Sequence, residues 1–312
     1  MDLSVIIEQI IKLFIVMAIG YGAAKTGYIT VQFKDIISNV IKKITLPLLI
    51  VTSMMSKELS SEVLVNTGIA ALSALVVIVV LYGAGLLSAK IFRLKEPTKT
   101  VHSLVTATGN VVFLGYPVIS AVYGADGLYY AVIYGIINDL FLWSIGVYLV
   151  NKSTGKSTSK EALKKLLNPN TLSCVVGILF MLLGIKFPKT LFDTLSGVGH
   201  LTTNLSMIFI GMVLSTVNIT KIYKRVSMLV IIVLKMVITP VIAAFLLSKF
   251  GINPVVCGAI VLQIAMPAQT VMSIITNEAG SDVSYSAEYI FLSTIISIGT
   301  LPLVYYLAER VI

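Results

Sequence analysis

The sequence predicts an all-α integral membrane protein of ten transmembrane helices, arranged as two inverted repeats of five. Of the 312 residues, 57% are hydrophobic and only 12% are charged, whereas soluble domains carry about 25% charged residues. The apolar residues gather in ten runs, each close to the length of about 20 residues that crosses a bilayer. One long polar stretch separates the first five runs from the last five.

The first apolar run is expected to be a membrane span rather than a cleaved signal. It has no basic region before it and contains Glu8 and Lys12. The predicted spans are 3–24, 35–55, 64–89, 101–123, 127–150, 170–187, 191–216, 226–248, 253–277 and 285–307. We therefore expect a first five-helix repeat at 1–150, a basic loop at 151–169 and a second repeat at 170–312.

Basic residues predict how the chain crosses the membrane. Sixteen Lys and Arg residues lie in or beside the loops that follow spans one, three, five and seven, and five lie on the opposite side. Basic loops stay in the cytoplasm, so both termini are expected outside the cell (plasma or inner) membrane. The net charge of +9 is then explained without a nucleic-acid partner. Five spans per half give the halves opposite orientations, as in secondary transporters.

The sequence offers little material for enzymatic or metal chemistry. The two cysteines, Cys174 and Cys257, and the two histidines, His102 and His200, lie in separate segments. They form neither a metal-ligand motif nor a histidine-based triad. Paired catalytic aspartates and an H-E-x-x-H motif are also absent from the sequence. We therefore expect a protein that is not an enzyme and that holds no metal or cofactor.

The fourth and ninth spans are expected to form a binding site. Each has a proline in mid-membrane, Pro117 and Pro267, and proline breaks or kinks a helix. Broken backbone survives in lipid only where it is buried in protein or lines a cavity. Each proline suits the first turn of a second half-helix, whose N-terminus would attract an anion; ordinary packing is the alternative. The accompanying small and polar residues are Gly109, Asn110, Gly115, Gln263 and Gln269.

Two charged side chains are predicted near the middle of spans. Asp139, which follows Asn138, lies in span five, and Lys235 lies in span eight. A charge inside the membrane is expensive and indicates function. Two interpretations stay open: an ion pair between Asp139 and Lys235 that holds helices together, or a proton- or cation-coupling site.

Four segments resemble the auxin efflux carrier family of membrane transporters, and the resemblance covers essentially the whole chain. They are FIVMAIGYGAAKTGYI (14–29), ISNVIKKITLPLLI (37–50), GNVVFLGYPV (109–118) and AMPAQTVMSIITNEAG (265–280). The family implies a ten-helix inverted-repeat fold similar to bile-acid symporters and sodium–proton antiporters. Spans one, two, six and seven would form a scaffold, often dimeric. The other six would form a transport domain that moves like an elevator.

The resemblance also implies a substrate class and residue roles. Family members carry organic anions such as malate, malonate or indole acetic acid. Asn110 matches the crossover asparagine that contacts the substrate carboxylate, and Pro117 and Pro267 match the crossover prolines. No asparagine neighbours Pro267, where this chain has Met266 and Gln269, so the anion and the symmetry of its site stay open. The expected partners are a small organic anion, membrane lipid and a second copy of the chain.

Four functions stay open from the sequence. The first is a carrier of a small carboxylate, coupled to protons, to sodium or to nothing. The second is a cation–proton antiporter or sodium-coupled symporter on the same fold, with Asp139 as the cation ligand. Asn138-Asp139 is similar to an acidic pair of the antiporter fold. The third is a membrane enzyme, but the catalytic residues that it would need are not visible in the sequence. The fourth is a sensor or channel.

The topology leads to a labelling prediction. In a variant without Cys174 and Cys257, a cysteine at Ser157 should not react with an impermeant thiol reagent in intact cells, because the basic loop stays in the cytoplasm. It should react after permeabilisation, and a matched cysteine at Ser60 should react in both conditions. Labelling of Ser157→Cys in intact cells would overturn the topology.

Overall fold

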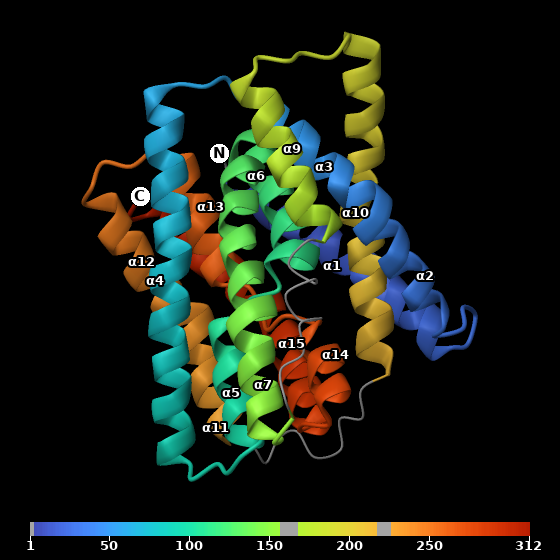
Figure 1. Cartoon of the computed structure of the whole chain (residues 1–312), viewed down its shortest axis with the longest axis vertical. Coiled ribbons are helices and arrows are strands. Elements are labelled where there is room, and N and C mark those ends of the chain that lie inside the picture. Colours follow the sequence, from blue (N-terminus) through green and yellow to red (C-terminus); the bar gives the residue numbers. More distant parts are fainter. Residues whose placement is uncertain (1–2, 157–167, 217–225) are drawn as a thin grey trace. The chain divides into compact units, whose positions relative to one another are not determined.

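The protein is built from helices (Figure 1). The computed structural model describes residues 3–156, 168–216 and 226–312. Within these ranges, seven helical segments are long and apolar enough to cross a membrane. Two shorter apolar helices are α9 (Pro169–Leu182) and α13 (Pro254–Ile264). The prediction of an all-α integral membrane protein is therefore confirmed.

Each described helix overlaps a predicted span, and α6 extends over two of them. The first half contains α1 (Leu3–Lys25), α2 (Phe33–Val40), α3 (Leu46–Met55), α4 (Ser61–Ile91), α5 (Thr98–Ala107), α6 (Tyr116–Phe141) and α7 (Val147–Ser153). The second half continues from α9 with α10 (Lys189–Ser215), α11 (Val226–Val233), α12 (Thr239–Ser248), α13, α14 (Met272–Ala279) and α15 (Val283–Glu309). The predicted loop 151–169 lies mostly outside the described residues, because only 151–156 and 168–169 are described.

Wider π-helical turns join several of these helices. They are η1 (Ile41–Thr45), η2 (Val111–Gly115), η3 (Leu142–Gly146) and η5 (Leu234–Ile238). Three of them end two residues before a proline, at Pro47, Pro117 and Pro240. Proline has no N–H and its ring clashes with the preceding turn, and an extra residue in that turn relieves both problems. These prolines therefore widen a continuous helix rather than end it.

Helix α6 changes direction at Gly124. Its φ of 63° and ψ of −155° are not helical, and glycine adopts such angles without the steric cost that a Cβ would add. The break lies between the predicted spans 101–123 and 127–150. The non-helical glycine thus lies at the boundary that the sequence predicted between its fourth and fifth spans.

The chain forms two compact units. Unit 1 contains Met1–Ile69, Val112–Ile133 and Leu167–Thr216, and unit 2 contains Ala70–Val111, Tyr134–Leu166 and Val217–Ile312. Unit 1 includes the helices expected to form the scaffold, and unit 2 includes most of those expected to form the transport domain. Each unit takes segments from both halves of the sequence. The boundaries 1–150 and 170–312 describe sequence repeats and stay a prediction.

In unit 1, glycines bring α1 and α10 into close contact. A Cβ on Gly20 would lie 2.4 Å from the carbonyl oxygen of Ile208, and one on Gly211 would lie 2.0 Å from that of Met17. No side chain fits at these distances. Small residues at such positions let two membrane helices pack backbone to backbone.

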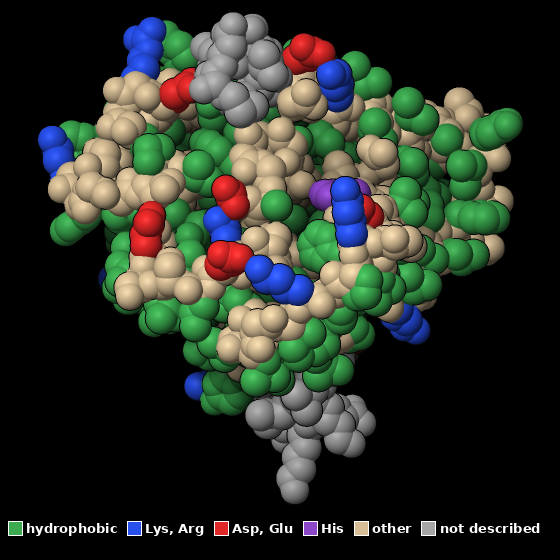
Figure 2. Space-filling model, turned by 90° about the horizontal axis from the view of Figure 1, so that it is seen from above, with side chains coloured by type: hydrophobic (Ala, Val, Ile, Leu, Met, Phe, Trp, Pro, Cys, Tyr) green, Lys and Arg blue, Asp and Glu red, His purple; other side chains and the backbone are tan. Residues whose placement is uncertain are grey.

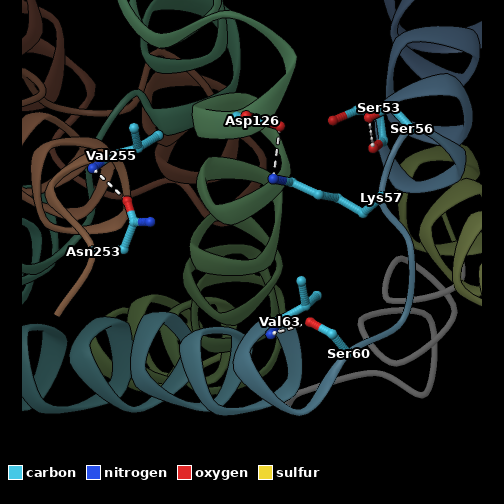
Figure 3. Close-up of polar contacts among 8 residues, drawn as sticks. All are labelled: Ser53, Ser56, Lys57, Ser60, Val63, Asp126, Asn253 and Val255. Carbon is cyan, nitrogen blue, oxygen red and sulfur yellow. Dashed lines mark hydrogen bonds and ion pairs between the residues drawn. The ribbon is translucent and has the colours of Figure 1, made fainter.

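Polar side chains order the connection between α3 and α4 (Figure 3). Lys57 Nζ lies 2.7 Å from Asp126 Oδ1 on α6 and 5.5 Å from the centroid of the Tyr130 ring. The Ser60 hydroxyl accepts a hydrogen bond from the Val63 N–H at the start of α4. Because the Asp126 side chain is 68% exposed, the ion pair is worth only about 0–1 kcal/mol. Its role is local ordering.

The outward faces of the helices are apolar. On α4, Leu72, Val79 and Val80 are all more than half exposed. Figure 2 shows hydrophobic side chains over much of the visible surface, with scattered charged side chains between them. Exposed apolar surface on this scale fits contact with lipid rather than with water.

The close packing of α1 and α10 leads to a stability prediction. Gly211→Ala should destabilise the protein by roughly 1–3 kcal/mol, because the added methyl group overpacks the interface. The measurement is the melting temperature in detergent. Gly197→Ala in the same helix is the control, since no atom lies within 4 Å of its Cβ position. Equal melting temperatures for the two variants would contradict this account.

Candidate functional site

Two broken helices meet in unit 2. Helix α5 ends at Ala107, and helical structure resumes at Val111; α13 ends at Ile264, and α14 begins at Met272. The extended segments between them pair through an antiparallel β-bridge of Gly109 with Ala268. The Asn110 N–H donates to the Pro267 carbonyl oxygen at 2.7 Å. Each break thus supplies hydrogen-bond partners for the other, as the membrane interior requires.

The prolines do not lie where the sequence predicted. Pro267 lies in the extended segment, five residues before α14, and Pro117 follows a helical turn that already begins at Val111. The expectation that each proline opens a new half-helix is therefore wrong. At Pro267 the reason is the β-bridge, which holds the backbone extended. At Pro117 the reason is η2, which absorbs the proline within a continuing helix.

Asn110 is buried without a hydrogen-bond partner. Its side chain is fully inaccessible, and among the described residues neither Nδ2 nor Oδ1 has a partner. Leaving a buried polar group unpaired costs about 1–3 kcal/mol, so such groups are rare and require an explanation. The hydroxyl of Thr270, in the second break, is also buried and unpaired within the described part of the chain. Both lie in the non-helical breaks.

A row of amides lies beside the first break. The Gly109 N–H donates to Asn138 Oδ1 at 3.2 Å, and Asn138 Nδ2 donates to Gln269 Oε1 at 3.1 Å. Gln269 Nε2 donates to Asp139 Oδ1 at 3.0 Å. Asn138 and Gln269 are buried. The row connects the backbone of the first break, the second break and the acidic residue of α6.

Lys235 caps the end of α5. Its Nζ donates to the carbonyl oxygens of Val105 at 3.0 Å and of Thr108 at 2.5 Å. The last carbonyls of a helix have no partner within it and carry partial negative charge, so they attract a buried ammonium. Lys235 thus bonds to the backbone of α5 and Asp139 bonds to Gln269, and an ion pair between Asp139 and Lys235 stays a prediction.

Two further contacts stabilise the breaks. Gln263 Nε2 donates to the Val111 carbonyl oxygen at 3.4 Å, and the Ala268 N–H donates to Ser293 Oγ at 3.1 Å. Ser293, on α15, was not predicted as a site residue. One of several serines in α15 carries no distinctive sequence signal, and only the packing of α15 identifies it.

The structure thus brings together most of the predicted site residues. The members in unit 2 are Gly109, Asn110, Asn138, Asp139, Lys235, Gln263, Pro267 and Gln269. Gly115 and Pro117 belong to unit 1, in η2 and α6, and have no place in this hydrogen-bond network.

Histidine and metal chemistry play no visible part in this arrangement. His102 is buried, with Nδ1 2.7 Å from the Tyr285 hydroxyl and Nε2 3.1 Å from Ser88 Oγ. Both ring nitrogens are satisfied, which is typical of a core histidine. In the residues that the structure describes, no cluster of three or more His, Cys, Asp or Glu side chains could hold a metal ion.

A cavity of about 580 Å³ lies elsewhere, in unit 1, where α3, α9 and α10 end or begin. It is lined by none of the predicted site residues. On its rim Lys186 Nζ lies 2.8 Å from Glu58 Oε1. This hydrogen bond and the charge attraction lower the pKa of Glu58 and raise that of Lys186. Both side chains are exposed, so solvent screens the pair.

Comparisons with known proteins agree with this architecture. Residues 5–305 match the model of a family described as membrane transport protein. The chain belongs to this family, the auxin efflux carrier family. The resemblance seen in the sequence is thereby confirmed. The protein is a multi-pass membrane transporter.

Its relatives are transporters from archaea and bacteria. An uncharacterized transporter of Methanothermobacter thermautotrophicus is 27% identical over 95% of this chain and 96% of its own length. One from Methanocaldococcus jannaschii is 23% identical over 93% and 95% of the two chains. The uncharacterized transporter YfdV of Escherichia coli is 21% identical over 68% and 70%. The similarity to the two archaeal proteins extends over nearly the whole chain.

Proposed function

We propose that this protein is a secondary transporter for a small organic anion. The substrate is a carboxylate such as malate, malonate or an auxin-like acid. The main support for this proposal is that the buried carboxamide of Asn110 has no hydrogen-bond partner among the described residues. Its Nδ2 offers two donors, and a carboxylate is the acceptor that would use them best.

Local electrostatics support an anion over a neutral substrate. Asn110 immediately precedes the helical turn that begins at Val111, and the first N–H groups of a helix attract negative charge. The buried ammonium of Lys235 bonds to the Thr108 carbonyl oxygen, two residues before Asn110. Lys235 thereby offsets the negative end of α5 next to the site.

The transport mechanism is part of the proposal. The two breaks lie in the fourth and ninth predicted spans, the same position in each half, which supports a ten-helix inverted repeat. Unit 1 would act as the scaffold and unit 2 as the moving domain of an elevator. We further propose a homodimer in the plasma or inner membrane with both termini outside and no bound cofactor.

A cation–proton antiporter or sodium-coupled symporter is the second candidate. Asp139 favours it, because this carboxylate lies one hydrogen bond from Gln269 of the second break. Uptake of radiolabelled malate, indole acetate and sodium into proteoliposomes separates the candidates. Sodium flux without uptake of either organic anion would favour the antiporter.

Asn110→Ala is expected to abolish anion transport without loss of stability. Losing a charge-assisted hydrogen bond of about 1.5–3 kcal/mol weakens binding roughly 10- to 150-fold. The same change removes a buried unpaired amide, so the melting temperature should stay equal or rise. Uptake and thermal unfolding in detergent are measured on the same preparation.

Ser293→Ala is a useful comparison. It removes a hydroxyl that accepts a bond from the Ala268 N–H, so it should lower the melting temperature. Wild-type uptake by a well-folded Asn110→Ala protein would refute the assignment of this side chain to the substrate.

Asp139→Asn is expected to flatten the dependence of uptake on an imposed pH gradient. An asparagine side chain does not bind or release a proton, whereas a carboxylate can do both. For coupling, its affinity must differ between outward-facing and inward-facing states. The measurement is uptake by proteoliposomes at several gradients. An unchanged pH profile would show that Asp139 only supports helix packing.

A further inference from the structure

The hydrogen bonds beside the first break have a single permitted direction. A backbone N–H only donates, so the Asn138 atom that faces Gly109 must be the carbonyl oxygen. The other end of that amide, Nδ2, is then a donor, and the Gln269 atom 3.1 Å from it must be Oε1. One fixed donor thus determines the orientation of both amides.

The direction continues to Asp139. With Oε1 facing Asn138, Gln269 presents Nε2 to Asp139 at 3.0 Å, so Oδ1 of Asp139 must accept. An ionised carboxylate has no proton to donate and meets this demand in every rotamer. The row therefore runs from a group that only donates, the Gly109 N–H, to a group that only accepts.

Because the two amides are buried, reversing the direction of their hydrogen bonds costs free energy. Asn138 and Gln269 are 1% and 4% exposed, so a reversed amide would find no water to compensate it. If Oδ1 of Asp139 ceased to accept, Gln269 could turn and place Nε2 against Nδ2 of Asn138. Asn138 would then turn in response and place Nδ2 against the Gly109 N–H. Before Asn138 turned, the mismatch would join Nε2 of Gln269 and Nδ2 of Asn138; after it turned, the mismatch would join Nδ2 of Asn138 and the Gly109 N–H. One contact between two donors would therefore remain in either arrangement, which is unfavourable.

The row ends at the first break, which also contains Asn110. Gly109 is bridged to Ala268 and directly precedes Asn110. A Cβ on Gly109 would lie 3.3 Å from Val111 Cγ1 and 3.4 Å from Met266 Cβ, so this backbone has little room to adjust. A change in the orientation of the Gly109 peptide therefore alters the position of Asn110.

We propose that Asn138 and Gln269 are positioning residues that relay the hydrogen-bonding state of Asp139 to the Gly109 peptide. While Asp139 accepts, the relay holds the first break in the observed form. When Asp139 no longer accepts, the amides of Asn138 and Gln269 are no longer held in this orientation. The Gly109 peptide can then change its own orientation. A second charged side chain at this break, Lys235, bonds to the carbonyls of Val105 and Thr108. The link to transport rests on the proposed function, whereas the relay itself does not.

The test reverses the direction of the relay. In Asn138→Asp the new carboxylate still accepts from Gly109 but also requires a donor from Gln269, which then turns its Oε1 toward Asp139. Two acceptors meet, so the melting temperature in detergent should fall and the substrate affinity should drop about tenfold, as for loss of one buried hydrogen bond.

Adding Asp139→Asn should rescue this variant, because the introduced carboxamide can turn and donate to Gln269. Asn138→Asp with Asp139→Leu is the matched control. Leucine has a similar size and also removes the neighbouring charge, but it donates no hydrogen bond. The relay therefore predicts two results. Asn138→Asp with Asp139→Asn should reach the melting temperature of Asp139→Asn alone. Asn138→Asp with Asp139→Leu should stay below the melting temperature of Asp139→Leu alone.

Equal recovery with both would show that only charge repulsion was relieved, and recovery with neither would show that the amides do not act in series. Either result overturns the relay. Because the melting temperature is measured without substrate, these outcomes are decided even if no organic anion is transported. Failure of the proposed function would appear instead as absent anion uptake by the wild-type protein.

Discussion

The structure depends on one constraint: backbone polar groups in the membrane interior need partners within the protein. The chain leaves the helical state at 108–110 and at 265–271, and neither break could exist alone. The Gly109–Ala268 bridge, the ammonium of Lys235 and the hydroxyl of Ser293 supply the missing partners. The site is built from the groups that satisfy this demand.

This constraint separates structural polar residues from those available to a ligand. Asn138 and Gln269 use both ends of their amides within the protein, so their removal is expected to disturb the breaks themselves. Asn110 uses neither end of its carboxamide among the described residues. Three amides of similar chemistry therefore differ in whether the protein itself supplies their hydrogen-bond partners.

Proline and glycine shape the helices around the site in different ways. Pro47, Pro117 and Pro240 follow π-helical turns, so the helix continues past them, whereas Gly124 turns α6. Gly20 and Gly211 have no side chain, which lets α1 and α10 pack closely against each other. One of the wider turns, η5, carries Lys235. A local irregularity thus places the buried ammonium that bonds to the end of α5.

The sequence by itself determined the environment and the family of this protein. Apolar runs predicted membrane helices, and paired polar, proline-containing segments at Asn110 and Pro267 predicted where helices break. These features are local, because they follow from hydropathy and from the backbone chemistry of each residue. The family motifs are likewise contiguous in the chain.

Tertiary structure alone decided which groups meet. Lys235 bonds to carbonyls about 130 positions earlier, and Gln269 lies between Asn138 and Asp139. The helix after the first break starts at Val111 rather than at Pro117, because a bridge to Ala268 holds the intervening residues extended. Such pairings depend on how segments far apart in the chain dock, and no local preference of a residue encodes that.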